Sequence, residues 1–408
     1  MSKKILFISQ YFYPEEFRGN DIAFDWIERG YDVTVICAIP NYPRGKYFTG
    51  YSLFKKRREI LKGVKIIRIP VIPRGKANGI MLMLNYFSFA FLASIYSFFH
   101  SLWIKYDLVF VQQLSPVTMA LPAVIVKKTQ KIPLFLWVLD LWPESLKSAG
   151  NINNKFVIDL FQLLVKFIYR NSSKILISSE GFKNSICAKG VHSEKIIYFP
   201  NWAEDSFTKI NRDLKIPILP EGFLVMFAGN IGEAQDFESV LSAALKLKEN
   251  KRIKFVLLGD GRKKKWIEKY CNENNLNETV YCLGRFPLDT MPLFFEKASV
   301  LMVSLKDEHI FNLTLPAKVQ AYMISGKPLI GMMNGEGNKV INESGCGYCV
   351  KASDVDEFSK KILVMSKHNK EELKRMGQLG ADYANLNFDK KILLNKLNEL
   401  IQAVSYNR

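Results

Sequence analysis

The stretch that decides the fold runs from Thr314 to Gly331 and reads TLPAKVQAYMISGKPLIG. Thr314 can cap a helix, Pro316 suits a first helical turn, and Gly326 can end the helix. An apolar strand then follows over Pro328–Gly331. A helix that leads into a strand is the pattern that much of the chain repeats.

Lys318 lies in the first turn of this helix, where the helix dipole is positive and a cation is unfavourable by roughly 0.3–1 kcal/mol. A bound anion would reverse that sign, because free backbone N–H groups and an ammonium directed at one spot form a phosphate cradle. The alternative is an exposed lysine with its head in water. The stretch alone supports both interpretations equally.

Outward from this stretch, short apolar strands alternate with helical patterns. In the first half we expect a helix over Asp21–Arg29 and strands over Lys4–Ser9, Val33–Cys37, Val64–Ile69, Leu108–Gln112, Leu134–Val138 and Lys174–Ser178. In the second half we expect strands over Phe223–Ala228, Ile253–Leu258, Val280–Leu283, Val300–Val303, Pro328–Gly331 and Tyr348–Val350. The alternation predicts an α/β fold with doubly wound parallel sheets.

The pattern stops and restarts once, which predicts two Rossmann-like domains facing a central cleft. We expect the first domain at residues 1–203 and the second at 221–386, with an irregular linker between them. The last periodic segment, 387–408, is amphipathic and is expected to pack back on the first domain.

The composition is that of a globular chain with a strong positive charge. The 408 residues are 48% hydrophobic and 24% charged, and the net charge is +18. The charge indicates an anionic partner, such as a membrane surface, nucleic acid or a phosphorylated substrate. No signal-peptide pattern opens the chain, so we expect a cytoplasmic location.

The segment 77–104 carries no Lys, Arg, Asp or Glu and is long enough to span a bilayer. A spanning helix would put the strand Leu108–Gln112 on the wrong side of the membrane from the strand at Ile5, which would split one sheet. We therefore reject a spanning helix. The remaining alternatives are a core helix and a helix whose outer face enters the membrane interface.

A basic cluster precedes this segment and favours the interface over a solvated loop. Between Lys55 and Lys76 there are nine basic residues and one acid, Glu59. Each basic residue near anionic lipid contributes about 1 kcal/mol. Nucleic acid is a poorer partner, because the basic residues do not interleave with exposed aromatic residues. We predict peripheral binding to the anionic cytoplasmic face of the inner membrane through Lys55, Lys56, Arg57, Arg58, Arg74 and Lys76.

Two carboxylates, Asp140 and Glu144, flank Trp142 in a loop after a predicted strand. Loops at strand ends commonly carry function. The two carboxylates can orient the hydroxyls of a sugar-like acceptor, and either can act as acid or base if its pKa is shifted. In the alternative interpretation, Asp140 caps the turn and Glu144 is a surface residue.

Two glycine-containing turns are candidates for binding anionic oxygens. Gly229-Asn-Ile-Gly232 follows the first strand of the second half and opens a helix, which makes a nest of N–H groups. Gly19 and Asn20 form the equivalent turn of the first half. Cys346 and Cys349 have C-x-x-C spacing without a second pair, so we expect reduced structural thiols. No paired metal-ligand motif, Walker-type phosphate loop or serine-hydrolase pattern occurs in the sequence.

A set of motifs is spread over nearly the whole chain. It comprises QYFYPE at 10–15 with Gly19-Asn20, PNYP at 40–43, DLWPE at 140–144, PNW at 200–202, GNIG at 229–232, PAKVQAYM at 316–323 and GKP at 326–328. Together these motifs resemble retaining glycosyltransferases of the GT-B fold, in the large family numbered four. Within it, they are most similar to the branch that includes N-acetyl-L-fucosamine transferases of bacterial O-antigen and capsule assembly.

The resemblance implies a uridine-diphosphate sugar donor held by the second domain and an undecaprenyl-diphosphate-linked acceptor held by the first. It implies a retaining reaction with no required metal or other cofactor. Lys318 would stabilise the leaving diphosphate, and Asp140 and Glu144 would orient the acceptor. The implied donor-binding residues are Gly19, Asn20, Gly229, Asn230, Gln235, Arg285, Phe286, Thr314, Leu315, Glu336 and Asn338, and the acceptor-binding residues are Asn41, Tyr42 and Trp142.

The chain departs from the family pattern at three places. Many relatives carry two Glu residues eight apart, where this chain has Leu313 and Ala321, so ribose recognition by a carboxylate at 321 is ruled out. Many relatives have His where this chain has Leu139. The usual basic pair after the first strand of the second domain is also missing, which places more of the anion's stabilisation on Lys318 and backbone dipoles.

We therefore predict a transferase that moves a sugar, expected to be an N-acetylated deoxyhexosamine, in O-antigen or capsule synthesis. Two alternatives remain open. A sugar-nucleotide epimerase of similar fold would form product without an acceptor. A non-catalytic membrane adaptor would form no donor-dependent product.

Overall fold

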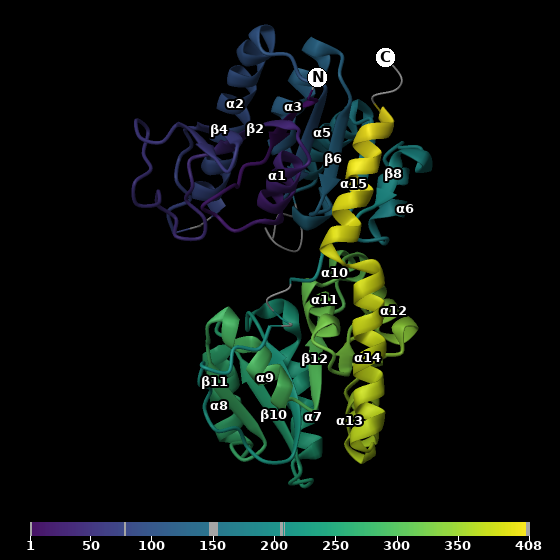
Figure 1. The fold of residues 1–408 in the computed structure, drawn as a ribbon. Coiled ribbons are helices and arrows are strands. Elements are labelled where there is room, and N and C mark those ends of the chain that lie inside the picture. Colours follow the sequence, from purple (N-terminus) through teal and green to yellow (C-terminus); the bar gives the residue numbers. More distant parts are fainter. Residues whose placement is uncertain (1, 77–78, 147–153, 205–206, 208, 405–408) are drawn as a thin grey trace. The chain divides into compact units, whose positions relative to one another are not determined.

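The computed structural model describes residues 2–76, 79–146, 154–204, 207 and 209–404. Parts of the predicted segments, at 77–78, 147–153 and 405–408, lie outside these residues. The chain divides into two compact units (Figure 1). Unit 1 comprises Met1–Pro200 and Leu394–Arg408, and unit 2 comprises Asn201–Leu393.

Unit 1 is built on an eight-stranded sheet in the order β3-β4-β2-β1-β5-β6-β7-β8, in which only β3 is antiparallel to its neighbour. Its six central strands follow the Rossmann order 3-2-1-4-5-6. The strands are β1 (Lys4–Ile8), β2 (Asp32–Ala38), β3 (Arg58–Leu61), β4 (Val64–Ile69), β5 (Leu108–Gln113), β6 (Leu134–Val138), β7 (Lys174–Ile177) and β8 (Ile196–Tyr198). The helices are α1 (Arg18–Glu28), α2 (Gly79–Trp103), α3 (Leu121–Gln130), α5 (Lys155–Asn171) and α6 (Phe182–Ala188), with short 3-10 turns at Val117–Ala120 and Ser193–Lys195.

Unit 2 is built on a six-stranded parallel sheet in the order β11-β10-β9-β12-β13-β14, which is again the Rossmann order. The strands are β9 (Phe223–Ala228), β10 (Ile253–Leu258), β11 (Val280–Gly284), β12 (Val300–Ser304), β13 (Leu329–Met332) and β14 (Gly347–Val350). The helices are α7 (Phe237–Leu247), α8 (Lys264–Glu273), α9 (Met291–Lys297), α10 (His309–Leu313), α11 (Ala317–Ile324), α12 (Gly335–Ser344), α13 (Val355–Lys367) and α14 (Lys370–Asn387). Two 3-10 turns, Glu233–Gln235 and Leu288–Thr290, complete the unit.

The last helix, α15 (Lys390–Val404), contributes most of its length to unit 1. Asn395 accepts a hydrogen bond from Arg29 at 2.7 Å, and Asn398 accepts one from Tyr31 at 2.6 Å. Lys396 donates to the carbonyl of Tyr198 at 2.8 Å. These polar contacts hold α15 against α1 and β8.

The central strands are continuous apolar runs because both faces of a parallel sheet are covered. All six residues of β9 are buried, and all five of β6. Strand β3 was not predicted, because its sequence REIL leaves every second side chain exposed at the sheet edge. The short β8 was not predicted either.

Helix α11 begins at Ala317, with Pro316 at its N-cap and no side-chain cap. The prediction that Thr314 caps this helix is wrong. Thr314 instead ends α10, where its hydroxyl donates to the carbonyl of Ile310 at 2.8 Å. Gly326 follows the C-cap residue with φ of +70°, a left-handed conformation that glycine adopts without strain.

Candidate active site in unit 2

The turn after β9 is shaped by glycines. Gly229 has φ of +143°, a conformation open to glycine and strained for other residues. Gly259, at the end of β10, has the same φ, and a Cβ atom there would lie 1.8 Å from the carbonyl oxygen of Gly229. The ends of the two neighbouring strands therefore meet backbone to backbone. They do so beside the topological switch point of the sheet, between β9 and β12, where α/β folds bind ligands.

Lys318 lies directly over this turn. A Cβ atom on Gly229 would be 2.5 Å from Cε and 3.1 Å from Nζ of Lys318. The ammonium sits 4.1 Å from the centre of the Phe227 ring, a favourable cation–π distance. Burial lowers the pKa of Lys318 to about 8. Among the described residues no carboxylate forms a salt bridge with it, so the cationic form lacks a compensating anion.

Lys318 opens onto a pocket of about 830 Å³. Five residues predicted from the sequence line it, namely Gly229, Asn230, Arg285, Phe286 and Lys318. The lining that sequence reasoning missed is largely apolar or aromatic and comprises Phe207, Ala228, Leu258, Pro287, Leu288, Met291, Phe295 and Tyr322. This combination of an apolar wall and a few polar groups is typical of small-molecule and cofactor pockets.

Two further lining residues bear on ribose recognition. Ala321 presents a methyl group at the position where many relatives carry a carboxylate. Asp260, in the turn after β10, is the one acid among the described residues that line the pocket. Its Oδ1 accepts a hydrogen bond from the backbone of Gly261 at 2.8 Å.

Tyr322 fixes the end of β9 from beneath. Its hydroxyl accepts from the backbone N–H of Ala228 at 2.8 Å and donates to the carbonyl of the same residue at 2.9 Å. Tyr322 exposes 2% of its surface, and burial raises the pKa of its hydroxyl. The side chain therefore anchors the residue that precedes Gly229. A tyrosine on a predicted helix gives no sign of this role in the sequence.

Several predicted donor residues are occupied by structural contacts. The side-chain oxygen of Gln235 accepts a hydrogen bond from the backbone N–H of Gly232 at 3.2 Å, which stabilises the turn after β9. The amide of Asn338 donates to the carbonyls of Met333, Cys349 and Val350 at 2.9–3.3 Å, which ties α12 to the sheet. The hydroxyl of Thr314 is used within α10. These groups are therefore engaged within unit 2, and binding of the sugar nucleotide by these residues remains a prediction.

The last two residues predicted to bind the sugar donor, Leu315 and Glu336, differ in exposure. Leu315 is 6% exposed and belongs to the apolar core of unit 2, so its side chain packs rather than binds. Glu336 lies in the first turn of α12 and is partly buried.

Residues after the strands of unit 1

Asp140 follows β6 and lies in a network with Ser115 and Trp142. Burial raises the pKa of the Asp140 carboxyl, and hydrogen bonds from Ser115 oppose that rise. The indole of Trp142 donates to the hydroxyl of Ser115 at 3.2 Å. Trp142 exposes 6% of its surface and packs on Phe161, so it leaves no ring face for a sugar. The prediction that Trp142 contacts the acceptor is corrected accordingly.

Glu144 is neither a free acid nor a simple surface residue. It accepts from Lys189 and from the hydroxyl of Ser185, both at 2.6 Å. Burial would raise the pKa of Glu144, but the hydrogen bonds from Lys189 and Ser185 outweigh it and lower the pKa. Lys189 is 5% exposed. The pair therefore fixes α6 to the loop after β6, which gives Glu144 a structural task.

Asn41 is 1% exposed, and its side chain is used inside the protein. Its amide donates to the carbonyl of Ile39, and its Oδ1 accepts from the backbone of Arg74 at 3.2 Å. It therefore supports the loop rather than contacting an acceptor. Tyr42 differs, since it is 40% exposed and stands beside the rings of Tyr11 and Phe17.

Glu15, the last residue of the QYFYPE motif, is a buried acid. Its Oε1 accepts the backbone N–H groups of Asn41 at 2.8 Å and Tyr42 at 2.6 Å. Its Oε2 is buried and finds no hydrogen-bond partner among the described residues. Burial raises the pKa of Glu15 to about 7. The signal in the sequence is that Glu15 follows β1; its two backbone N–H donors come from residues distant in the chain.

Gly19 and Asn20 lie inside α1, one turn earlier than predicted. A Cβ atom on Gly19 would be 2.2 Å from Oε1 of Gln112, so glycine is required for α1 to approach β5. The side chain of Asn20 donates to the carbonyl of Glu15 at 2.8 Å and accepts from Tyr13. Both residues thus shape the loop after β1, and a role in donor binding remains a prediction.

The basic segment before α2 divides into exposed and buried members. Lys55, Lys56 and Arg58 are exposed, and Lys76 is exposed as well. Arg68 is fully buried and pairs with Glu59 at 2.6 Å. Arg74 lies 4.9 Å from the ring centre of Tyr42 and 5.8 Å from that of Tyr86. Arg74 is therefore enclosed by tyrosines and does not belong to a lipid-facing surface.

No group of three or more His, Cys, Asp or Glu residues suited to a metal ion occurs within the described part of the chain. Cys346 and Cys349 are both buried free thiols, and burial raises the pKa of each to about 11 and about 12, respectively. These protonated thiols pack in the core of unit 2.

Two sheets with Rossmann strand order, one in each unit, define the GT-B class of α/β proteins. Residues 20–202 match the family described as glycosyl transferase 4-like domain. Residues 210–382 match the glycosyl transferases group 1 family. The chain is therefore a glycosyltransferase, with a 4-like domain followed by a group 1 domain.

Two relatives indicate the range of similarity. The probable glycosyltransferase WbjE of Pseudomonas aeruginosa is 27% identical over 54% of this chain and 57% of its own length. The putative colanic acid biosynthesis glycosyl transferase WcaI of Escherichia coli is 24% identical over 91% of this chain and 92% of its own length. The chain thus aligns with just over half of WbjE and with nearly all of WcaI.

Solved structures confirm the predicted fold class. HepE of Anabaena in complex with UDP superposes with a TM-score of 0.68 at 12% identity, over 99% of this chain and 100% of that one. The sucrose-phosphate synthase of Thermosynechococcus elongatus superposes with a TM-score of 0.74 at 13% identity, over 100% of both chains. At such identities the likeness concerns the fold alone.

Proposed function

We propose that this glycosyltransferase moves a sugar from a UDP-sugar to a lipid-diphosphate-linked saccharide, with retention of anomeric configuration. We further propose an N-acetylated deoxyhexosamine as the sugar and O-antigen or capsule synthesis as the setting. The motifs shared with the N-acetyl-L-fucosamine transferase branch support the sugar. The name of WcaI, which refers to colanic acid biosynthesis, supports a polysaccharide product.

The observation that carries the proposal is the placement of Lys318 over Gly229 in the unit 2 pocket. A partly buried ammonium without a carboxylate partner among the described residues is costly unless an anion joins it. A diphosphate supplies that anion, and the strand-end turn beside it offers backbone groups at the sheet's switch point. The UDP held by HepE, a protein of the same fold, supports this choice of ligand.

The proposed chemistry needs stabilisation of the leaving group. As the bond between the sugar and the diphosphate breaks, negative charge grows on the diphosphate oxygens, and Lys318 stabilises that charge. Losing one preorganised donor of this kind typically costs about 2.7–4 kcal/mol of transition-state stabilisation. Because position 321 is Ala, we assign the ribose hydroxyls to Asp260, the acid of the pocket lining. Asp140 would orient the acceptor in unit 1, and its raised pKa suits a group that can also hold a proton.

We place the protein peripherally at the cytoplasmic face of the inner membrane. Within the described residues, α2 is long and apolar enough to cross a membrane, and little of its apolar stretch is buried inside the protein. Its attachment to unit 1 argues against crossing, since Asn85 accepts from Gln10 at 2.8 Å and donates to the carbonyl of Ile72 at 2.6 Å. An interfacial helix fits both facts.

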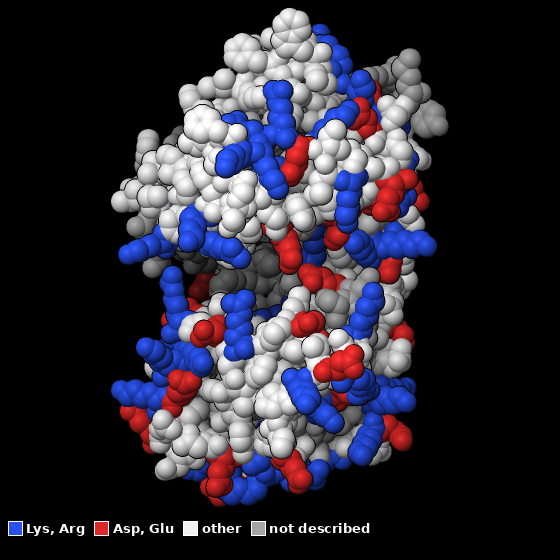
Figure 2. Space-filling model, turned by 60° about the vertical axis from the view of Figure 1, so that its left-hand side comes forward, with Lys and Arg blue, Asp and Glu red and all other residues white. Residues whose placement is uncertain are grey.

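The exposed surface of α2 supports an interfacial position. Its buried residues include Asn85, Ser97 and Ser101, whereas its exposed residues are large and apolar. The most exposed of these are Ile80 at 72%, Phe91 at 66%, Phe99 at 58% and Trp103 at 86%. This is the inverse of a helix that faces water. Near the top of Figure 2, at the height of α2 in Figure 1, a broad uncharged surface is bordered by Lys and Arg side chains.

The test is incubation with a panel of nucleotide sugars, with and without membrane lipid extract, followed by measurement of released nucleoside diphosphate. We expect release that requires both a UDP-sugar and the lipid extract. An altered sugar nucleotide formed without lipid would identify an epimerase. No donor-dependent product with any combination would identify an adaptor.

A second test addresses the membrane. We expect cosedimentation with anionic vesicles to fall when Lys55, Lys56, Arg57 and Arg58 are replaced by Gln. Unchanged cosedimentation would contradict the assignment of this basic segment to the membrane.

A further inference from the structure

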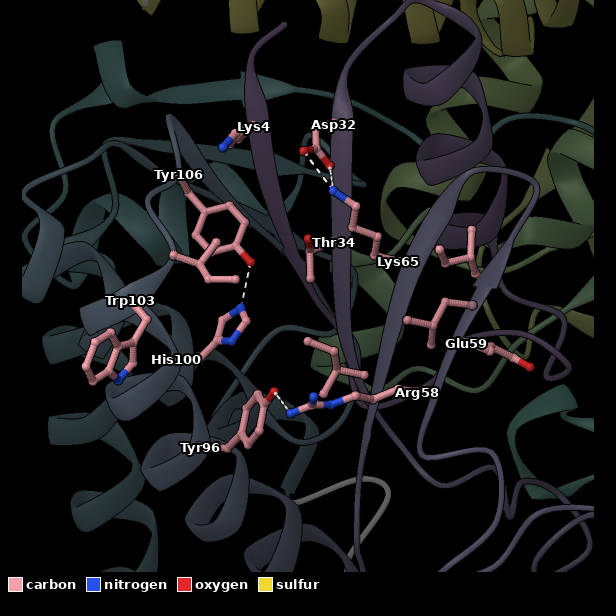
Figure 3. Close-up of a pocket in the computed structure, with 14 residues that line it drawn as sticks. Lys4, Asp32, Thr34, Arg58, Glu59, Lys65, Tyr96, His100, Trp103 and Tyr106 are labelled. Atoms are coloured by element: carbon pink, nitrogen blue, oxygen red, sulfur yellow. Dashed lines mark hydrogen bonds and ion pairs between the residues drawn. The ribbon is translucent and has the colours of Figure 1, made fainter.

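A groove runs along one side of α2, on the face that looks toward β3 and β4. It consists of two adjoining hollows of about 600 Å³ and 430 Å³, which share Arg58, Tyr96, His100 and Trp103. All of the residues that line both hollows belong to unit 1. Figure 3 shows Tyr96 and His100 projecting from α2 toward Arg58 and Tyr106.

One helical face forms the apolar wall of the groove. Tyr96, His100 and Trp103 follow the spacing i, i+4, i+7, and Leu92 and Phe99 continue the wall. His100 bonds to the hydroxyl of Tyr106 at 2.7 Å. Burial and then the charge of Arg58 lower the pKa of His100, so the ring is neutral at pH 7 and adds to the apolar surface.

The centre of the groove carries two guanidinium groups without acid partners. Arg58 donates to the hydroxyl of Tyr96 at 3.3 Å, and Arg57 donates only to backbone carbonyls, those of Arg68 and Leu53. Neither forms a salt bridge within the described part of the chain. The acids that line the groove are already neutralised.

Each of those acids has its own basic partner. Glu59 pairs with the buried Arg68 at 2.6 Å, and Asp32 pairs with Lys65 at 2.8 Å. The positive charge of Arg57 and Arg58 is therefore left for a ligand. A phosphate group suits it best, because guanidinium groups bind phosphate oxygens through paired, charge-assisted hydrogen bonds.

We propose that this groove binds one anionic phospholipid, with its phosphate at Arg57 and Arg58 and one acyl chain along Leu92, Tyr96 and Phe99. This inference rests on the proposed membrane association and gives it a specific contact. A lipid fits better than a free anion because the groove adjoins the exposed apolar face of α2. A free phosphate would leave those walls in water, whereas an acyl chain covers them.

The groove runs beside α2 along the length of β4. Its first hollow extends to Lys4, Asp32 and Lys65, which lie at the amino-terminal ends of β1, β2 and β4. Its second hollow, which would hold the acyl chain, is lined by Ile69 and Pro70 at the carboxyl end of β4. Asp140 and Glu15, which belong to the proposed acceptor side, follow two other strands, β6 and β1. The role of the lipid is to orient unit 1 on the bilayer.

The test uses full-length protein and dihexanoyl phosphatidylglycerol below its micelle concentration, so that no bilayer is present. We expect saturable binding with one lipid per protein by calorimetry, and binding at least about tenfold weaker for dihexanoyl phosphatidylcholine. Arg58→Gln is expected to weaken phosphatidylglycerol binding at least about tenfold as well. Lys183→Gln makes the same charge change at an exposed position of α6 and should leave binding unchanged.

A second variant tests the apolar wall without touching the guanidinium groups. Ile95, which lines the groove and is 43% exposed, is replaced by Asp, and we expect loss of binding with an unchanged unfolding temperature. Trp103 is 86% exposed, whereas Trp26, Trp137, Trp142 and Trp202 are at most 6% exposed. Trp266 is partly exposed but lies on α8 of unit 2, so the difference in tryptophan emission between the wild type and Trp103→Phe gives the local readout. Phosphatidylglycerol vesicles brominated in the acyl chain should quench the emission of the wild type and much less that of Trp103→Phe.

The outcomes separate the groove from the wider proposal. Vesicle binding without binding of the short-chain lipid, or equal losses in Arg58→Gln and Lys183→Gln, would overturn the lipid groove and leave membrane association standing. Inorganic phosphate that binds as tightly as the lipid would overturn the lipid in favour of a free anion. No binding to vesicles of any composition would overturn both.

Discussion

The fold holds the ammonium of Lys318 where burial disfavours its charge. Burial lowers its pKa to about 8, from an ordinary value of 10.5, so the fold disfavours the charged form. Between these two values the unfolded chain binds a proton that the folded chain does not, and stability rises with pH. Below about pH 8 the protein carries the full cost of the buried charge.

The first prediction concerns the variant Lys318→Met. We expect a higher unfolding temperature than the wild type at pH 7, a difference that shrinks as the pH approaches 10.5, and a fall in kcat of about 100-fold or more. Thermal unfolding at pH 7 and pH 10, together with diphosphate release, measures both. A near-normal kcat would remove Lys318 from the mechanism, and a lower unfolding temperature at pH 7 would contradict the buried-charge argument.

The lowered pKa of Lys318 also leads us to expect proton uptake when UDP binds. A diphosphate beside Lys318 stabilises the ammonium, so its pKa should rise and UDP binding at about pH 8.5 should take up protons. Calorimetry in buffers with different ionisation enthalpies measures this uptake. The control is Lys318→Met, for which we expect none. Equal uptake by the two proteins would show that another group titrates.

Glu15 has the opposite effect to Lys318 on how the stability of the protein depends on pH. Burial raises its pKa to about 7 from 4.5, so the folded protein holds a proton that the unfolded chain releases, and stability falls as pH rises between these values. Glu15→Gln keeps an oxygen for the N–H groups of Asn41 and Tyr42 and removes the charge. We expect the variant to be more stable than the wild type by about 1–3 kcal/mol at pH 8 and similar at pH 4.5. Urea unfolding of both proteins at both pH values measures the difference. A Glu15→Gln variant less stable than the wild type at pH 8 would mean that neighbouring groups compensate the charge of the Glu15 carboxylate.

At the scale of elements, the turn after β9 controls the position of Lys318. In Gly229→Ala the new methyl group would meet Cε of Lys318 at 2.5 Å, and the backbone would be strained at φ of +143°. We expect UDP binding to weaken at least about tenfold. The control is Gly326→Ala, which also places alanine at a positive φ, +70°, but with nothing within 4 Å of the new methyl group. If both variants lose binding equally, strain rather than contact with Lys318 is responsible.

Strands whose residues are nearly all buried could be predicted from the sequence. Strands β4, β6, β9 and β10 begin and end at the predicted residues, because each is an apolar run bounded by polar or turn residues. Strand β3 could not be predicted in this way. Its REIL sequence has the charges of an edge, and its pairing with β4 follows from a turn whose geometry depends on Lys62 and Gly63, both at positive φ.

The candidate site was predictable only in part, for a related reason. Gly229 and Lys318 stand out because their residue types are unusual at a strand end and in a first helical turn. Asn338 and Asn41 look like binding residues in the sequence, but their amides are used up by nearby carbonyls. Hydrogen-bond occupancy depends on tertiary contacts, and residue type alone does not reveal it.

At the scale of the whole molecule, two forces act on the proposed contact with the membrane. The net charge of +18 attracts anionic lipid over about 10 Å at 0.1 M salt, and this attraction is screened as salt increases. The apolar face of α2 acts only on contact and does not depend on salt. The two contributions can therefore be separated.

We expect binding to phosphatidylglycerol vesicles to weaken between 0.05 and 0.5 M NaCl without vanishing, because the aromatic face of α2 remains effective after the charges are screened. Replacing the exposed Phe91 and Phe98 by Ser should remove the binding that persists at 0.5 M while leaving most of the binding at 0.05 M. The matched control replaces Phe156, an exposed residue of α5, by Ser. Cosedimentation across the salt series measures each protein. Complete release of the wild type at 0.5 M would mean that charge alone holds it, and an unchanged high-salt fraction in the double variant would assign that fraction to a surface other than α2.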